Sequence, residues 1–294
     1  MPTISKQIQP NPRRISRYLN VVALSVITGL VFYREAILMV LTEVINRNDS
    51  SHGVFVPFLS VYFLWTIKER FKTLEVGYSK PGLVVMIACL LVRFSTIGNF
   101  QSQFLAFIGF TCGLVLFFLG WPVFKNTAFP LLFLVTMTPL PQDLYDGLAN
   151  ISRTIAFGGS LKIISLLGIP YLRIGWDIEL PNALLKVAIS CSGIRYLISF
   201  FVFGLAYAYL FKTSTISRTL TVASTIPISL FASICRLTII FTMTYYVGPF
   251  WSEHKPHVAL SWFIFFTVLF FSMFLDQWLQ KKMEKEEKRK RRDK

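Results

Sequence analysis

The chain has 294 residues, of which 54% are hydrophobic and only 15% are charged, whereas an average soluble protein is about 25% charged. This composition excludes a soluble enzyme, a disordered chain and a collagen-like fibre, and it indicates a polytopic membrane protein. The formal net charge of +15 is concentrated at the two ends, where four basic residues and no acid precede residue 18, and nine basic residues and four acids follow residue 280. Basic clusters beside apolar segments are typical of the cytoplasmic face of a membrane protein, so we expect no nucleic acid among the partners.

Apolar runs recur along the whole chain, and a run of about 20 apolar residues is enough to cross a bilayer. We therefore predict an all-α polytopic fold with about eight transmembrane helices, forming a single integral membrane domain over residues 1–294. The predicted spans are 18–33, 53–67, 81–98, 104–121, 127–140, 191–211, 219–246 and 257–279. The apolar segment from Glu35 to Val44 is shorter, and we predict that it is an interfacial helix.

The distribution of basic residues predicts the orientation of these spans. Eight crossings place both termini on one side, and that side then holds twenty Lys and Arg residues, while the other side holds eight. Because cytoplasmic loops are enriched in Lys and Arg, we expect a multi-pass protein of the cell membrane with residues 1–17 and the basic tail 281–294 in the cytoplasm.

The longest segment between predicted spans, residues 141–190, is expected on the extracytoplasmic side. From Asp143 to Leu167 its apolar residues recur with helical spacing, which predicts an amphipathic helix lying in the outer interface. The following residues alternate and break at Gly175 and at Pro181-Asn182, which predicts a small β-hairpin of residues 172–180 and 184–189. This hairpin leads directly to Cys191.

Cys191 combines three features that suit a nucleophile. It follows the predicted hairpin, it begins a predicted helix whose N-terminal N–H groups would stabilise a thiolate, and Arg195 stands one turn later on the same face. The other three cysteines lack this combination and fit packing in apolar runs. No pair has C-x-x-C spacing and none has a metal-binding histidine neighbour, so we expect no metal, no disulfide and no cofactor.

Two further residues could complete a reactive site with this thiol. Arg236 lies within the seventh predicted span, where an ionisable residue is costly and so suggests a function. His257 begins the eighth span. The predicted topology places Cys191, Arg236 and His257 in the outer part of three successive spans, and a thiol, a guanidinium and an imidazole at one depth can carry out acyl transfer.

At these positions the sequence resembles the exosortase/archaeosortase family of multi-pass membrane cysteine transpeptidases, from about Asp49 onward. The matching motifs are Ser51-His52-Gly53 with Val56-Pro57 and Leu59-Ser60, Thr138-Pro139-Leu140-Pro141, Ile178-Glu179-Leu180-Pro181, Cys191-Ser192-Gly193-Ile194-Arg195, Arg236, and His257 ahead of Trp262. The resemblance implies a catalytic Cys191, an Arg236 that stabilises the oxyanion and a His257 that protonates the leaving amine. It also implies exported protein substrates with a C-terminal tripartite sorting signal, and a thioester released to an amine-bearing acceptor, with membrane lipid as one candidate, or to water.

The same motifs supply candidate substrate-binding residues, namely His52, Ser192, Arg195 and Ser233. Arg195 suits three roles equally: substrate binding, a second oxyanion contact or a structural ion pair. The chain departs from the family pattern in having Ile189 where an acid is common, and Ser233-Ile234 where Asn-Gly is common. Since Ser233 can still donate a hydrogen bond, we expect a tuned site or a distinct subfamily.

Two other classes of function fit the composition. A transporter or flippase would bind an anionic substrate with Arg195 and Arg236, and it predicts internal repeats, which the sequence does not show. A non-catalytic assembly protein would tolerate replacement of Cys191.

Overall fold

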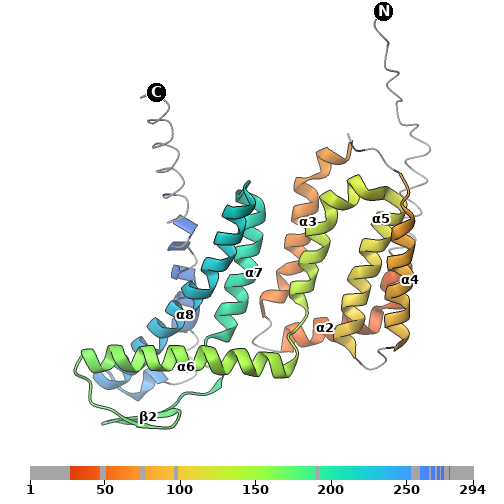
Figure 1. The fold of residues 1–294 in the computed structure, drawn as a ribbon. Helices are drawn as coiled ribbons and strands as arrows, with labels where there is room; N and C mark the ends of the chain where they lie inside the picture. The colour runs from red at the N-terminus through yellow and green to blue at the C-terminus, as the bar shows by residue number, and fades with distance from the viewer. Residues whose placement is uncertain are drawn as a thin grey trace, which may run out of the picture. The chain divides into compact units, whose positions relative to one another are not determined.

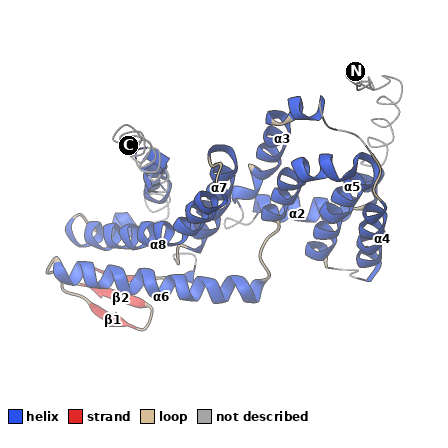
Figure 2. Cartoon of the chain, turned by 45° about the horizontal axis from the view of Figure 1, so that its top comes forward, coloured by secondary structure: helices blue, strands red, loops and turns tan. Residues whose placement is uncertain are grey.

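The structure is a computed structural model that describes residues 27–46, 51–72, 74, 77–95, 99–189, 192–252, 259–264, 266–268, 270–271, 273–274 and 278. These residues are mostly helical, with one small antiparallel sheet among them (Figures 1 and 2). Packing divides the chain into an N-terminal unit that ends at Pro139 and a C-terminal unit that begins at Leu140. The helical prediction is therefore confirmed for the described part of the chain.

The N-terminal unit consists of helices joined by short turns. Its elements are α2 (Arg34–Asn46), η1 (Ser51–Val54), α3 (Val56–Thr66), η2 (Lys68–Lys72), α4 (Lys80–Ser95), α5 (Phe100–Phe133) and η3 (Leu134–Met137). The helix predicted over residues 35–44 is α2, and α3 lies within the span predicted over 53–67. α4 begins one residue before the span predicted over 81–98 and ends within it. Of the span predicted over 18–33, only residues from 27 onward are described, and 27–32 are helical.

The long helix α5 contains the span predicted over 104–121 and the first part of the span predicted over 127–140, which continues into η3. The chain turns back near the end of the first of these spans (Figure 1). The break is Gly120, whose φ of +81° lies in the left-handed region that glycine adopts most readily. A Cβ at this position would also lie only 2.6 Å from the carbonyl oxygen of Gly77, which precedes α4. Pro122 follows, in the first turn of the second half, where its missing N–H costs nothing.

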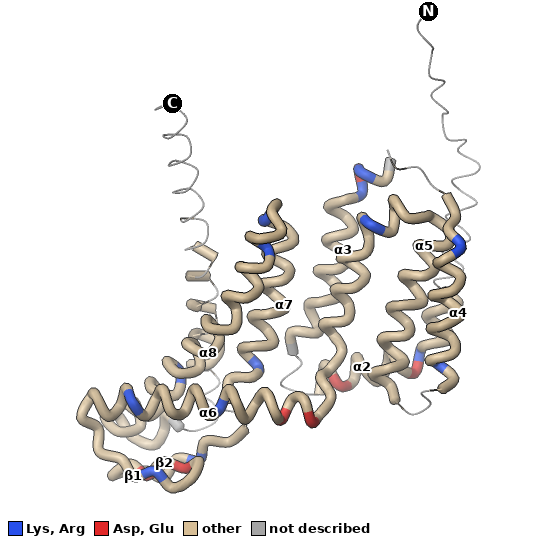
Figure 3. The backbone as a smooth tube through the Cα atoms, viewed as in Figure 1, with Lys and Arg blue, Asp and Glu red and all other residues tan. Residues whose placement is uncertain are grey.

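Basic residues gather at one end of the N-terminal unit, where α3 ends, α4 begins and α5 turns (Figure 3). Two of them lie over exposed tryptophans: Lys68 Nζ is 4.7 Å from the Trp65 ring centroid, and Lys125 Nζ is 5.6 Å from that of Trp121. Trp and Lys together are typical of a membrane–water interface. The loops that the charge count assigns to one side of the membrane thus share one end of this unit.

The C-terminal unit consists of α6 (Gln142–Leu166), a three-stranded sheet, α7 (Ile194–Phe211), α8 (Thr215–Tyr246), η5 (Pro249–Ser252) and helical residues that begin at 259. The prediction of a helix over 143–167 is confirmed by α6, and α7 and α8 lie close to the spans predicted over 191–211 and 219–246. Three helices of the described chain are long and apolar enough to cross a membrane: Phe100–Met137, Ile194–Phe211 and Thr215–Tyr246.

The sheet differs from the predicted hairpin because its first strand is two strands. The strands β1 (Leu172–Ile174), β2 (Asp177–Leu180) and β3 (Ala183–Lys186) form an antiparallel meander in that order. The two expected breaks, Gly175 and Pro181-Asn182, are both tight turns between strands. Gly175 has a φ of +63°, which allows the chain to reverse there rather than bulge.

One hydrophobic core joins α6, the sheet and α8. Its buried residues include Phe157 and Ile164 of α6, Ile178 of β2, and Ile240 and Phe241 of α8. The buried face of α6 is not simply the face with the large apolar side chains. Small side chains on α6 are fully buried, such as Ala149 and Ala156, whereas Leu144 and Ile151 are exposed.

Candidate functional site

Of the three residues predicted to carry the chemistry, Cys191 and His257 lie outside the described residues, and Arg236 lies within them. The structure does describe the elements on either side of those two positions. Ser192 and α7 follow Cys191, β3 precedes it, and the helical residues 259–264 begin two residues after His257. These elements therefore define the described surroundings of the site.

The glycine of the Cys-Ser-Gly motif brings the start of α7 against α8. Gly193 has a φ of +81° and caps α7, and a Cβ on it would overlap Oγ of Ser233. Only glycine satisfies both conditions, because other residues are strained at this φ and would collide with α8. Ser233 is buried, and its hydroxyl donates a 2.8 Å hydrogen bond to the carbonyl oxygen of Ser229.

Ser192 is also fully buried, and its contacts shape the turn that enters α7. Its backbone N–H donates to the carbonyl oxygen of Ile189 over 2.9 Å, and its Oγ accepts a 3.2 Å hydrogen bond from the N–H of Ile194. A hydroxyl that accepts from an early helix N–H satisfies one of the donors that a helix start leaves open. The structure thus gives Ser192 and Ser233, both predicted to bind substrate, local packing and hydrogen-bonding roles at the start of α7.

Arg236 lies on α8 one turn after Ser233 and is only 5% exposed. The carbon at the centre of its guanidinium is 5.1 Å from the ring centroid of Tyr196, a residue of α7. A guanidinium over an aromatic face is attracted to the ring, and more strongly when both groups are shielded from water. This contact holds a buried cation between α7 and α8, close to the start of α7.

Tyr196 also connects these two helices to the segment that follows His257. Its hydroxyl donates a 2.8 Å hydrogen bond to the carbonyl oxygen of Ser261, and its ring packs in a buried cluster with Ala232 and Ile264. Sequence reasoning missed Tyr196, since an aromatic residue in an apolar span is normally read as packing. The signal that could have found it is its phenol, because a buried Tyr hydroxyl needs a partner.

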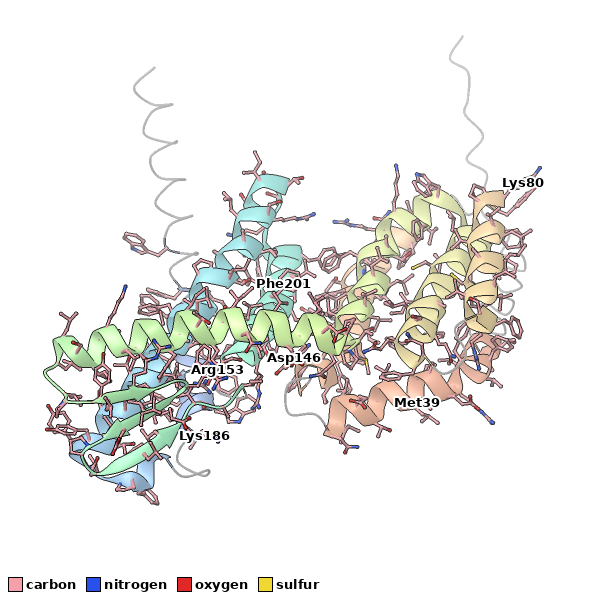
Figure 4. The ribbon with its side chains drawn as sticks, turned by 60° about the horizontal axis from the view of Figure 1, so that its bottom comes forward. Met39, Lys80, Asp146, Arg153, Lys186 and Phe201 are labelled. Carbon is pink, nitrogen blue, oxygen red and sulfur yellow. The ribbon has the colours of Figure 1, made fainter. Side chains whose placement is uncertain are left out.

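Arg153 of α6 fixes the chain that leads from the sheet to Cys191, in the region shown in Figure 4. Its guanidinium nitrogen Nη2 donates to the carbonyl oxygen of Val187, and its guanidinium carbon lies 4.1 Å from the ring centroid of Trp176. The N–H of Val187 in turn donates a 3.2 Å hydrogen bond to the carbonyl oxygen of Trp176. The sequence indicated Arg153 only as an outer basic residue, because its partners are more than twenty residues away.

The turn between β2 and β3 is attached to the end of α8. The side-chain nitrogen of Asn182 donates to the carbonyl oxygens of Thr244 and Tyr245, over 2.7 and 3.1 Å. The last carbonyls of a helix have no partner within the helix, so this side chain supplies one. The sheet is therefore held at one end by α6 and at the other by α8.

The remaining predicted residues have other surroundings. Arg195 is half-buried, and among the described residues its guanidinium has no hydrogen-bond or ion-pair partner. His52 belongs to the N-terminal unit, where it is buried and its Nε2 lies 3.3 Å from the carbonyl oxygen of Thr136. Arg195 belongs to the C-terminal unit and lies two residues after Gly193, at the start of α7. His52 belongs to the N-terminal unit and connects η1 to η3.

Within the described ranges, no group of three or more His, Cys, Asp or Glu side chains could hold a metal ion. The described cysteines, Cys89, Cys112 and Cys235, are free thiols. Cys235 adjoins Arg236 on α8 and is half-buried. This thiol therefore offers an internal comparison for experiments on Cys191.

Comparison with known proteins identifies a family. The model of the transmembrane exosortase family (Exosortase_EpsH) matches residues 44–274, a range that includes α7, α8 and all three residues of the predicted chemistry. Neither a curated protein nor a solved structure matches the chain. The match covers most of the chain and agrees with the membrane-length helices and with the motif that begins at Cys191. The chain belongs to the transmembrane exosortase family.

Proposed function

We propose that this protein cleaves the C-terminal sorting signal of exported proteins through a thioester on Cys191 and transfers the protein to an acceptor at the outer face of the cell membrane. Membership of the exosortase family implies a membrane sorting transpeptidase with protein substrates that carry a sorting signal. The proposal adds the roles of individual residues, the orientation with both termini in the cytoplasm, and the eight crossings.

The observation that carries the proposal is the convergence of three elements at Tyr196. Tyr196 lies on α7 and directly follows the Cys191–Arg195 motif. Its ring contacts Arg236 of α8, and its hydroxyl donates a hydrogen bond to the carbonyl oxygen of Ser261, four residues after His257. Residues that lie within, or directly beside, three elements in mutual contact can share a site. A Cβ on Gly193 would overlap Ser233, which lies one turn before Arg236 on α8. This close approach also supports contact between the start of α7 and the part of α8 that contains Arg236.

In the proposed reaction the Cys191 thiolate attacks the carbonyl carbon of the scissile peptide bond, and the Arg236 guanidinium stabilises the resulting oxyanion. The C–N bond then breaks as the His257 imidazolium gives its proton to the leaving amine. The substrate remains as a thioester on Cys191. An acceptor amine or water next attacks that thioester, His257 takes its proton, and the thiolate of Cys191 is restored.

The test is to co-express the protein with an exported protein that has a tripartite C-terminus, and to look by mass spectrometry for cleavage and for an acyl adduct on Cys191. Cys191→Ala should abolish both, while the matched variant Cys235→Ala, which removes a thiol beside Arg236, should retain them. Cleavage that persists in Cys191→Ala would remove Cys191 as the nucleophile. The transporter and assembly functions would then become the better hypotheses.

A further inference from the structure

The strand β3 forms one edge of the sheet, and its outward N–H groups belong to Leu184 and Lys186. The carbonyl oxygen of Lys186 already accepts a 3.1 Å hydrogen bond from the N–H of Ala188. The N–H of Val187 bonds to Trp176, which continues the pairing of β3 with β2. In an antiparallel pair the residues that exchange hydrogen bonds alternate with those that do not. If Val187 bonds toward β2, then Leu185 and Ala183 do so as well, and the N–H groups of Leu184 and Lys186 point away from the sheet.

Within the described part of the chain, no backbone group pairs with either of these N–H groups. The side chain of Leu184 is 65% exposed and that of Lys186 is exposed, so the edge is flanked by accessible side chains. An exposed edge of this kind is a template for another strand, and proteins normally cover it or use it.

This edge is anchored at both ends by hydrogen bonds and leads to Cys191. Arg153 and Trp176 hold the chain at Val187, and Asn182 holds the preceding turn against α8. Cys191 follows Lys186 by five residues, which span at most about 17 Å when fully extended. A peptide paired with β3 is therefore separated from the proposed nucleophile by no more than this short length of chain and the spacing of one strand.

We propose that the edge of β3 binds the extended segment of the substrate's sorting signal, which adds to the sheet as a fourth strand and so presents its scissile bond to Cys191. This inference rests on the proposed function, and it assigns the binding surface for the same substrate. Main-chain hydrogen bonds to Leu184 supply affinity for any extended sequence, and the exposed side chains of Leu184 and Lys186 contact alternate residues of the peptide.

The opposite edge of the sheet provides a matched comparison. Arg173, at the centre of β1, pairs with Ile178. Since Ile178 exchanges its hydrogen bonds with β3, the N–H of Arg173 also points outward. β1 follows α6 and does not lead to Cys191. A proline at either position removes one outward N–H and leaves the main-chain hydrogen bonds of the sheet in place, as prolines on edge strands do. At position 173 it also removes the hydrogen bond from Nε to the carbonyl oxygen of Gly175 and the guanidinium contact with Phe157.

The first test compares Leu184→Pro with Arg173→Pro, using a synthetic peptide that spans the cut site mapped on the wild type. Leu184→Pro should lower kcat/KM about tenfold, chiefly by raising KM, because one main-chain hydrogen bond and its neighbours are lost. Arg173→Pro should leave kcat/KM within about twofold of the wild type. Leu184→Ala keeps the N–H and should retain more activity than Leu184→Pro. Equal effects of the two prolines would overturn the proposal.

The second test changes the peptide and leaves the sheet of the protein unchanged, so it does not depend on the folding of a proline variant. Peptides are N-methylated at one backbone position at a time, and their binding to the Cys191→Ala variant is measured. Strand addition predicts that every second methylation weakens binding about tenfold and that the intervening ones have little effect. Sensitivity without this alternation would refute strand addition. Peptide cleavage by the wild type that depends on Cys191 tests the proposed function separately, so the two ideas can fail independently.

Discussion

The guanidinium carbon of Arg236 lies 5.1 Å from the ring centroid of Tyr196. The hydroxyl of the same tyrosine donates a hydrogen bond to the carbonyl oxygen of Ser261, so one side chain joins α7, α8 and the helical residues that begin at 259. Each of these elements begins beside, or contains, a residue of the proposed chemistry. The geometry of the site should therefore depend on Tyr196. Its hydroxyl bonds to a backbone carbonyl, so we expect Tyr196 to position the neighbouring elements.

Tyr196→Phe removes the hydroxyl and keeps the ring over Arg236. Losing one buried hydrogen bond should lower the free energy of unfolding by about 1 kcal/mol. Because the segment after His257 loses an attachment, kcat should fall by about tenfold to 100-fold, with little change in KM. Steady-state kinetics with a synthetic peptide that spans the mapped cut site check this result. A variant with normal kcat and reduced stability would show that Tyr196 contributes only to packing.

Gly193→Ala should lower the free energy of unfolding by about 1 to 3 kcal/mol from backbone strain alone, and the overlap with Ser233 adds to this cost. Ser233→Gly removes the overlapping side chain, so it should partly rescue Gly193→Ala in a double-mutant cycle. The measurement is chemical unfolding in detergent of the two single variants and the double variant. Strictly additive effects would mean that the two residues do not contact each other.

Arg236→Lys keeps the positive charge but loses the planar, forked donor geometry. If Arg236 stabilises the oxyanion, kcat should fall by about 100-fold, the order seen when an oxyanion donor is removed. The control is Arg173→Lys, which changes an exposed arginine on β1. This variant should keep wild-type turnover. Wild-type turnover in Arg236→Lys would show that Arg236 acts only through its positive charge and not through its donor geometry.

Arg153→Leu removes the guanidinium that donates to Val187 and stacks on Trp176. The amide of Val187 should then exchange its hydrogen faster, and kcat should fall because the chain before Cys191 is less well fixed. Hydrogen exchange followed by mass spectrometry reports on the first effect and peptide cleavage on the second. Lys162→Leu, an exposed change on the same helix, should alter neither. Unchanged exchange at Val187 would contradict a positioning role for Arg153.

Two glycine substitutions should have opposite effects on stability. A Cβ on Gly82 would collide with the backbone of α5 at Phe117, whereas a Cβ on Gly147 of α6 would meet no atom within 4 Å. Gly82→Ala should therefore destabilise the protein by about 1 to 3 kcal/mol. Gly147→Ala should stabilise it by about 0.4 to 1 kcal/mol, because alanine has less backbone freedom to lose. Thermal unfolding in one detergent tests both signs.

Much of the fold could be predicted from the sequence because its signals are local. The length and apolar character of the runs at 191–211 and 219–246 predicted α7 and α8, and helical spacing predicted α6. The breaks at Gly175 and Pro181-Asn182 were also predictable, since turn residues act through their own backbone preferences. Whether Gly175 bends one strand or separates two strands depends on which strand pairs with it. The prediction of one strand over residues 172–180 was wrong, because β1 and β2 are separate strands that pair with each other.

For the site, the sequence by itself determined the membrane-protein class, the family resemblance, and Cys191, Arg236 and His257 as candidates, whose roles stay predictions. Only the tertiary structure decided that Gly193 meets Ser233, that Tyr196 joins Arg236 to Ser261, and that Arg153 holds the chain before Cys191. The reason is physical. Hydrophobicity and turn preference belong to each short segment, whereas the partner of a buried hydroxyl or guanidinium is chosen by how distant segments pack.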